Sequence, residues 1–136
     1  MKNACLVCCL LILALSLSCG HPRAMTSMTI TPDTATVNGF GAIIPVQYKA
    51  YGTFIHPAET RDISQEVEWA TDVPQVATVA NGANGGLVTP AGVACGTTNI
   101  TATAGRNLVG GNGGSGSVMT ATATFIVKDS NIPGCQ

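Results

Sequence analysis

His21 and His56 are the only histidines in the sequence, and they are the first residues to consider for catalysis or metal binding. A nucleophile–base pair would need His56 beside a Ser or Thr, but hydroxyl residues are so numerous that nearness in sequence indicates nothing. Neither histidine stands at a zinc-ligand spacing from a cysteine or from the other histidine. Both are expected to be solvated loop residues, and the sequence predicts no catalytic residue and no metal site.

Glu59, Asp62, Glu66 and Glu68 form the only acidic cluster. Carboxylates gathered in this way could serve calcium binding or glycosidic chemistry. The Asp-x-Asp-x-Asp-Gly spacing of a calcium loop is absent, so a solvated face or a charged strand edge explains the cluster better. No combination of His, Asp and Glu predicts a catalytic pocket. The expectation is a protein that is not an enzyme and uses no cofactor.

The first 18 residues have the layout of a secretory signal peptide. A start made positive by Lys2 precedes an uncharged run over residues 4–17, which is too short to span a bilayer core of roughly 30 Å. Three of the six cysteines lie inside this leader and would be lost with it: Cys5, Cys8 and Cys9.

Cys19 is the expected lipidation site, because small residues precede it and the chain then turns polar. The arrangement resembles the lipobox of bacterial lipoproteins, in which the cysteine becomes the lipidated first residue. That motif usually has Leu where this chain has Ser16, so ordinary signal peptidase could instead release a soluble protein starting at Cys19. Lipid would hold the protein on a membrane of the cell envelope through a tether at residues 19–27. Without lipid it would be secreted or periplasmic.

Charge is sparse in the mature chain. Loss of Lys2 with the leader leaves 5 basic against 7 acidic side chains, a formal net charge of −2. No basic stripe is present, so nucleic acid is not expected as a partner. Abundant β-branched residues, punctuated by 16 Gly and 7 Pro, favour many short strands joined by tight turns.

Short runs of alternating apolar and polar residues continue from Met28 to the end of the domain. They lie at residues 28–31, 34–37, 43–51, 67–70, 76–80, 87–89, 99–104 and 118–127. Residues 52–64 are the most irregular stretch, and residues 110–117 form a Gly-rich loop. The pattern predicts an all-β, immunoglobulin-like β-sandwich of about seven to nine short strands over residues 28–128, with a C-terminal tail at 129–136.

Several motifs follow one another in a fixed order along these strands. Ile30-Thr31-Pro32 matches an I-x-P strand end, and residues 67–79 (VEWATDVPQVATV) match V-x-W-x-S-x-d-x-x-v-A-x-V. Residues 86–89 (GLVT) and 95–102 (CGTTNITA) continue the series. Together they resemble the bacterial immunoglobulin-like domain of group 2, known from intimin- and invasin-type adhesins. Cys95 and the Gly-rich loop depart from that pattern. The resemblance implies an Ig-like fold and a spacer or adhesive role at a cell surface.

Trp69 is expected to fill the space between the two sheets, because it stands in a strand among alternating apolar residues. The predicted core comprises Trp69, Val67, Val76, Val79 and Ile100.

Cys95 and Cys135 are predicted to form a disulfide. If lipid occupies Cys19, they are the only cysteines left to pair in an oxidising compartment. Pro133-Gly134 would turn the tail back toward the strand that follows Cys95. Two free thiols are the alternative.

The leading functional hypothesis is a non-enzymatic, surface-attached module for adhesion, binding or structural presentation. Its partners would be the membrane, through the N-terminal lipid, and a protein or glycan ligand. Residues 56–64 and the Gly-rich loop at 110–117 are the candidate binding loops. The alternative is a carbohydrate- or substrate-binding accessory protein of an exported enzyme system, which an exposed patch containing Tyr51 and Phe54 would favour.

Overall fold

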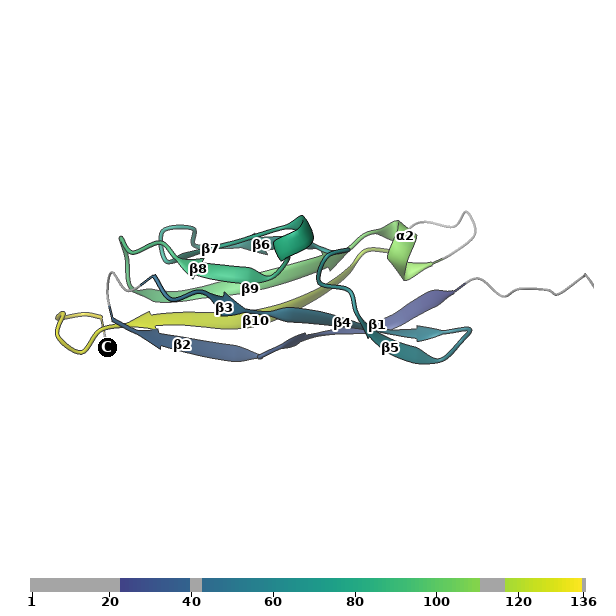
Figure 1. Cartoon of the computed structure of the whole chain (residues 1–136), viewed down its shortest axis with the longest axis horizontal. Coiled ribbons are helices and arrows are strands. Elements are labelled where there is room, and N and C mark those ends of the chain that lie inside the picture. The colour runs from purple at the N-terminus through teal and green to yellow at the C-terminus, as the bar shows by residue number, and fades with distance from the viewer. Residues whose placement is uncertain (1–22, 40–42, 111–116, 136) are drawn as a thin grey trace, which may run out of the picture.

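A computed structural model describes residues 23–39, 43–110 and 117–135 of the 136-residue chain (Figure 1). The predicted signal peptide at residues 1–18 and the predicted lipidation site, Cys19, lie outside the described residues. Most of the predicted Gly-rich loop lies outside them as well. In the described part of the chain, no helix is long and apolar enough to cross a membrane.

The first layer consists of two three-stranded sheets that meet at Tyr48. β3 (Val46–Gln47) belongs to one of them and β4 (Lys49–Ile55) to the other. β1 (Ala24–Thr31) pairs antiparallel with β4 along one edge. Along the other edge, β8 (Leu87–Pro90) pairs with β3, and β5 (Glu59–Asp62) pairs with β4. β7 (Ala77–Val79) extends the sheet beyond β8.

The second layer is a single four-stranded sheet with the strand order β2-β10-β9-β6. β2 (Thr34–Asn38) runs parallel to β10 (Met119–Lys128), whereas β9 (Gly96–Ala104) is antiparallel to β10 and to β6 (Glu68–Thr71). The break between β1 and β2 contains Pro32, which cannot donate a ladder hydrogen bond, and at this break the chain crosses from the first layer to the second. Two short helical turns, η1 (Gly82–Asn84) and α2 (Arg106–Val109), lie in connections between strands.

The predicted all-β, Ig-like sandwich is confirmed, but the described residues form ten strands and not seven to nine. β1 already begins at Ala24, so residues 24–27 belong to a sheet and not to the predicted tether. Residues 52–64, expected to be irregular, contain the second half of β4 and all of β5. Gly52 interrupts the alternation of apolar and polar side chains in this segment. A Cβ at this position would lie 2.8 Å from Sδ of Met25 and 2.9 Å from Cε2 of Phe54, so the core-facing position carries no side chain.

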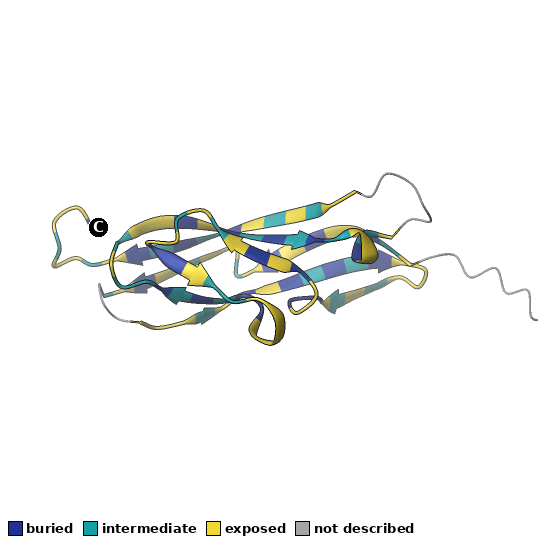
Figure 2. Cartoon of the chain, turned by 90° about the horizontal axis from the view of Figure 1, so that it is seen from above, coloured by how far each residue is buried: buried dark blue, intermediate teal, exposed yellow. Residues whose placement is uncertain are grey.

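The core lies between the two sheets, and buried and exposed residues alternate along the strands that enclose it (Figure 2). Trp69 is only 3% exposed, and its indole Nε1–H donates to the backbone oxygen of Ser64 at 2.8 Å. Val67, Val76 and Ile100 are also buried. Val79 is half-buried and packs against the same cluster. The sole tryptophan therefore joins the two layers through its ring.

Tyr48 connects the two sheets through its hydroxyl group. The side chain is fully buried, and the hydroxyl donates to the backbone oxygen of Thr124 on β10 at 2.7 Å. Its ring meets Phe125 edge-on, with centroids 6.4 Å apart. Burial raises the pKa of Tyr48 to about 12, since an ionised phenolate would lose its hydration there.

The elongated sandwich carries different parts of the chain at its two ends (Figure 1). At the N-terminal end, β1 begins near the connection between β4 and β5 (residues 56–58) and α2. At the opposite, C-terminal end lie the end of β2, the connection between β8 and β9 (residues 91–95) and the tail at residues 129–135. The two ends are therefore separated by the full length of the strands.

The predicted disulfide between Cys95 and Cys135 is present at the C-terminal end, with the two Cα atoms 5.6 Å apart. The backbone N–H of Asp129 donates to the carbonyl of Cys135 at 2.6 Å, and that of Cys135 donates to the carbonyl of Ile132 at 3.0 Å. Cys135 is buried. The tail is thus closed into a turn and held against the domain.

Candidate functional site

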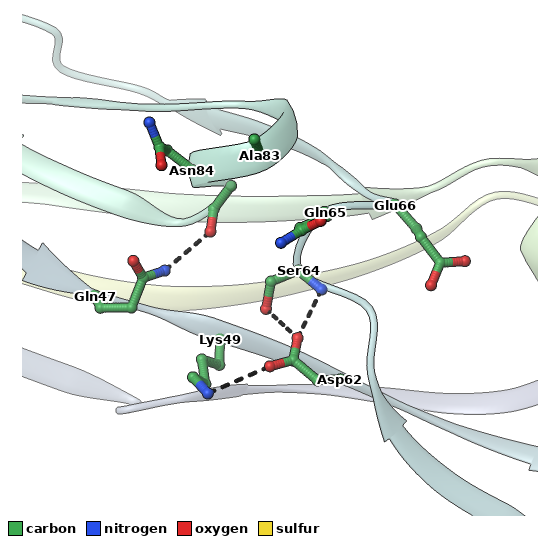
Figure 3. A pocket seen from close by; sticks show the side chains of 9 residues that line it. Gln47, Lys49, Asp62, Ser64, Gln65, Glu66, Ala83 and Asn84 are labelled. Carbon is green, nitrogen blue, oxygen red and sulfur yellow. Dashed lines mark hydrogen bonds and ion pairs between the residues drawn. The ribbon is translucent and has the colours of Figure 1, made fainter.

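Polar side chains line a groove of about 490 Å³ where the stretch from β3 to β4 lies uncovered between β8 and β5 (Figure 3). β8 and β5 pair with β3 and β4 along the same edge, but neither strand covers the stretch between them. The backbone N–H and C=O groups of that stretch therefore need other hydrogen-bond partners. The lining residues are Gln47, Lys49, Asp62, Ser64, Gln65, Glu66, Ala83, Asn84 and Gly85.

Ser64 and Asp62 fill one side of this groove. The Ser64 hydroxyl accepts a hydrogen bond from the backbone N–H of Ala50 at 2.9 Å and donates to Oδ1 of Asp62 at 2.6 Å. The backbone N–H of Ser64 donates to the same oxygen at 2.9 Å, and Nζ of Lys49 lies 3.4 Å from Oδ2. These hydrogen bonds from Ser64 hold the pKa of Asp62 below its usual range.

Gln47 closes the other side of the groove. Its Nε2 donates to the backbone oxygens of Gly85 at 2.9 Å and Tyr48 at 2.7 Å, while the backbone N–H of Tyr48 donates to Gly86 at 2.8 Å. Gly86 has φ +82°, and a Cβ there would lie 2.2 Å from the Tyr48 oxygen. Only glycine permits this close approach.

The groove does not have the arrangement of a nucleophilic site. The Ser64 hydroxyl is bonded to a carboxylate and a backbone amide, whereas an activated serine needs a general base such as histidine. His56 lies elsewhere, at the tip between β4 and β5. No group of three or more His, Cys, Asp or Glu residues in the described ranges could hold a metal ion. The polar groups of the groove replace missing strand pairing, which is a structural role.

The acidic residues that lie close together in the sequence pair with different cations or belong to different sheets. Arg61 makes a two-armed ion pair with Glu66, which lowers the pKa of that carboxyl, and the second arm measures 3.0 Å. Glu59 lies 2.8 Å from Arg23. The guanidinium groups of Arg61 and Arg23 lie 4.8 and 5.6 Å from the centroid of the Phe54 ring. Glu68 belongs to the other sheet. These carboxylates therefore do not form one open binding site.

Aromatic residues of the described ranges do not form an exposed patch. Phe54, which would favour a carbohydrate-binding role if it were exposed beside Tyr51, is buried below two arginines. Trp69 is buried as well, and Tyr51 is half-buried. Stacking on sugar rings would require an aromatic face open to solvent.

Large exposed apolar side chains in the described ranges lie at the two ends of the sandwich. Ile43 and Ile44 precede β3, and Val93, which is 71% exposed, lies between β8 and β9; these three residues of the C-terminal end are called the C-terminal apolar patch. Ile55 and Val118 are exposed at the N-terminal end. Exposed apolar groups gathered together often mark interaction surfaces.

A second groove, of about 590 Å³, lies at the C-terminal end between the end of β2 and the disulfide-closed tail. Amide, hydroxyl and charged side chains line it: Asn38, Gly39, Lys128, Asp129, Ser130 and Asn131. The C-terminal end therefore combines an apolar patch, a polar hollow and a covalently fixed tail. The sequence does not mark Val93 or the residues of this groove, since isolated residues in connections produce no periodic signal. Ile43 and Ile44 fall in the predicted strand at residues 43–51, but the observed strand begins only at Val46 and leaves both of them exposed.

Comparison with protein families finds a match to the bacterial Ig-like domain (group 2) over residues 24–110. No curated protein matches the chain in the corresponding search. The family match ends before β10, but β10 pairs with both β9 and β2 and so completes the same sandwich. The match covers more than half of the chain, and the chain therefore belongs to the group 2 bacterial Ig-like domains.

Proposed function

We propose that this protein is a non-enzymatic module, attached to the cell envelope through Cys19, that presents the C-terminal end of its sandwich to a protein partner. Group 2 Ig-like domains are non-catalytic modules of bacterial surface and exported proteins, which is the setting that the proposal assumes. The observation that carries it is the separation of the two ends of the molecule. The chain enters at one end, whereas the C-terminal apolar patch and the fixed tail lie at the other.

Attachment at Cys19 would determine which end faces outward. Arg23 lies four positions after Cys19, and a fully extended chain over four such steps reaches at most about 14 Å. The N-terminal end would therefore stay close to the membrane. Of the binding loops that the sequence offered, residues 56–64 and the Gly-rich loop, the tip at 56–58 and the described ends of the Gly-rich loop lie at this membrane-near end. The C-terminal end is better placed to meet a partner.

The chemistry of the C-terminal end favours a protein ligand over a glycan. Ile43, Ile44 and Val93 offer aliphatic contact area, and the adjacent groove offers amides and hydroxyls, a combination found in the core and rim of protein interfaces. The described residues offer no exposed aromatic face for a sugar ring. The disulfide limits the motion of the tail, which reduces the entropy lost on binding.

Attachment is tested by metabolic labelling with a fatty-acid analogue. The wild-type protein should be labelled and recovered with membranes, and the Cys19→Ala variant should be neither. Labelling of the variant, or a wild-type protein found wholly in the soluble fraction, would refute the lipid anchor.

Presentation is tested by capture from envelope extracts with the mature domain as bait. The double variant Ile44→Glu, Val93→Glu should lose a captured protein that the wild-type domain retains. The matched control, Ile55→Glu, changes an exposed aliphatic residue at the other end and should capture as the wild type does. Equal capture by all three baits would show that the C-terminal end is not the binding surface.

A further inference from the structure

We infer that the N-terminal end of the sandwich docks on the lipid bilayer surface, with Ile55 and Val118 in the interfacial region. This inference rests on the proposed attachment at Cys19. It concerns the other end of the molecule from the proposed partner site, and it assigns a surface and an orientation that lipid attachment alone does not require.

Apolar groups at the N-terminal end are exposed where a membrane surface would meet them. Ile55 is 41% exposed at the end of β4, and Val118 is 62% exposed immediately before β10. The tip that follows Ile55 contains His56, Pro57 and Ala58, all exposed and without a carboxylate. Both apolar residues thus lie at the end where the tether leaves the domain (Figure 1).

The charged side chains at this end balance one another. Arg106 is exposed on α2, and Arg23 stands at the start of β1. The nearby carboxylates are Glu59, which lies 2.8 Å from Arg23, Glu66, which is paired with Arg61, and the exposed Glu68, which stands opposite Thr103 just before α2. Three arginines thus face three carboxylates, and this end carries no excess of negative charge. Anionic phospholipid headgroups repel an excess of carboxylates, so a balanced surface leaves the apolar contact unopposed.

The short reach from Cys19 brings this end to the bilayer. Because four residues span at most about 14 Å, lipid insertion holds Arg23 within that distance of the headgroups. A lipid chain acting alone gives only modest membrane affinity, and a second contact stabilises attachment. Ile55 and Val118 supply such a contact, and the C-terminal end then points away from the membrane by about the length of β10, roughly 33 Å.

The test uses the full lipidated protein in vesicles of phosphatidylethanolamine and phosphatidylglycerol. Single cysteines are introduced as Ile55→Cys, Val118→Cys or Val93→Cys and spin-labelled, since Cys95 and Cys135 are bonded to each other and lipid blocks Cys19. Collision rates with oxygen, which concentrates in lipid, and with a water-soluble nickel complex are measured for each label. The Val93 label is the matched control, because that residue is also an exposed aliphatic side chain but lies at the other end.

Docking predicts a several-fold rise in the oxygen-to-nickel collision ratio for labels at 55 and 118 on vesicles, compared with the same protein in detergent, and no change at 93. The doubly changed protein Ile55→Glu, Val118→Glu, labelled at residue 57 through Pro57→Cys, should show no rise. Ratios at 55 and 118 that match the ratio at 93, with lipid on Cys19 verified by mass, would overturn the docking and leave the anchor intact. A fall in both collision rates would indicate a protein contact at this end and would also overturn it. Absence of lipid on Cys19 would overturn both proposals.

Discussion

Replacing Trp69 by alanine should remove a large part of the stability of the domain. The side chain is 3% exposed, so the change deletes nearly the whole ring from the interface of the two sheets. It also leaves the Ser64 carbonyl, now bonded at 2.8 Å, without its indole donor. Truncation of a buried aromatic residue costs about 3–5 kcal/mol. A small domain has a total stability of about 5–15 kcal/mol, so the variant should be marginally folded or unfolded.

The backbone around Trp69 should not compensate for the lost ring. Asn81 accepts from the backbone N–H of Trp69 at 2.7 Å and donates to its carbonyl at 3.0 Å, which holds β6 in place whatever side chain is present. The surroundings can therefore collapse only partly into the cavity, and a cavity adds to the cost of truncation.

Urea unfolding measured by far-ultraviolet circular dichroism gives the free-energy difference, because Trp69 is the only tryptophan and its loss removes the fluorescence signal. Trp69→Phe keeps most of the apolar area and should cost about 1–3 kcal/mol, mainly through the unpaired Ser64 carbonyl. Tyr51→Ala, an aromatic truncation at a half-buried position, should cost clearly less than Trp69→Ala. A loss below about 1 kcal/mol for Trp69→Ala would refute the assignment of Trp69 to the core.

Three further predictions concern single interactions. Tyr48→Phe should destabilise the domain by about 1–3 kcal/mol, because the half-buried Thr124 carbonyl loses its donor. Since the folded-state pKa of Tyr48 is raised to about 12, its contribution to the free energy of unfolding is complete below pH 10 and falls as the pH rises toward 12. Ultraviolet titration of the folded and urea-unfolded protein would detect the difference between the two pKa values. The pKa of Asp62 is lowered, so its contribution to the free energy of unfolding is present above the ordinary carboxyl pKa and is lost at more acidic pH. Asp62→Asn should therefore make the free energy of unfolding less dependent on pH on the acidic side. Cys135→Ser opens a loop with a sequence separation of 40 and should cost about 4 kcal/mol in thermal or urea unfolding, and alkylation of the non-reduced wild type should add no mass at Cys95.

The sandwich was predictable because its signals are local. Alternation around Trp69 and Ile100 indicates strands with one buried face, and the spacing of turn residues indicates many short strands. The disulfide was predictable by elimination, since removal of the leader leaves few cysteines to pair. Each of these inferences needs only neighbouring residues or a count.

The β4–β5 hairpin was not predicted because its core-facing positions are occupied by residues that hide the pattern. Gly52 has no side chain to register as apolar, yet the side chains of Met25, Phe54 and Ile63 fill the space beside it. Charged residues alternate along β5 and pair with one another across the surface, which resembles a loop in composition. Tertiary packing, and not local propensity, makes this segment a strand.

The arrangement of loops at the two ends could not be predicted from a list of strands. Which connections share an end depends on strand directions and on the crossing of β1 to β2, and these follow from long-range pairing. The same holds for the groove beside Ser64, whose lining comes from β3, β4, η1 and the segment after β5. That Ile44 and Val93 lie at the same end of the sandwich follows from the antiparallel pairing of β3 and β8, which no local signal predicts.

Photo-crosslinking in cells that make the protein tests the central claim most directly, namely that the C-terminal end is the presented surface. A photoreactive amino acid replaces Val93 at the C-terminal apolar patch, Ile55 at the N-terminal end, or Thr120 on an exposed face of β10. We expect a discrete protein adduct from position 93 and none from positions 55 and 120. Adducts that form only from position 55, or with equal yield from all three positions, would contradict the assignment of the C-terminal end as the binding surface.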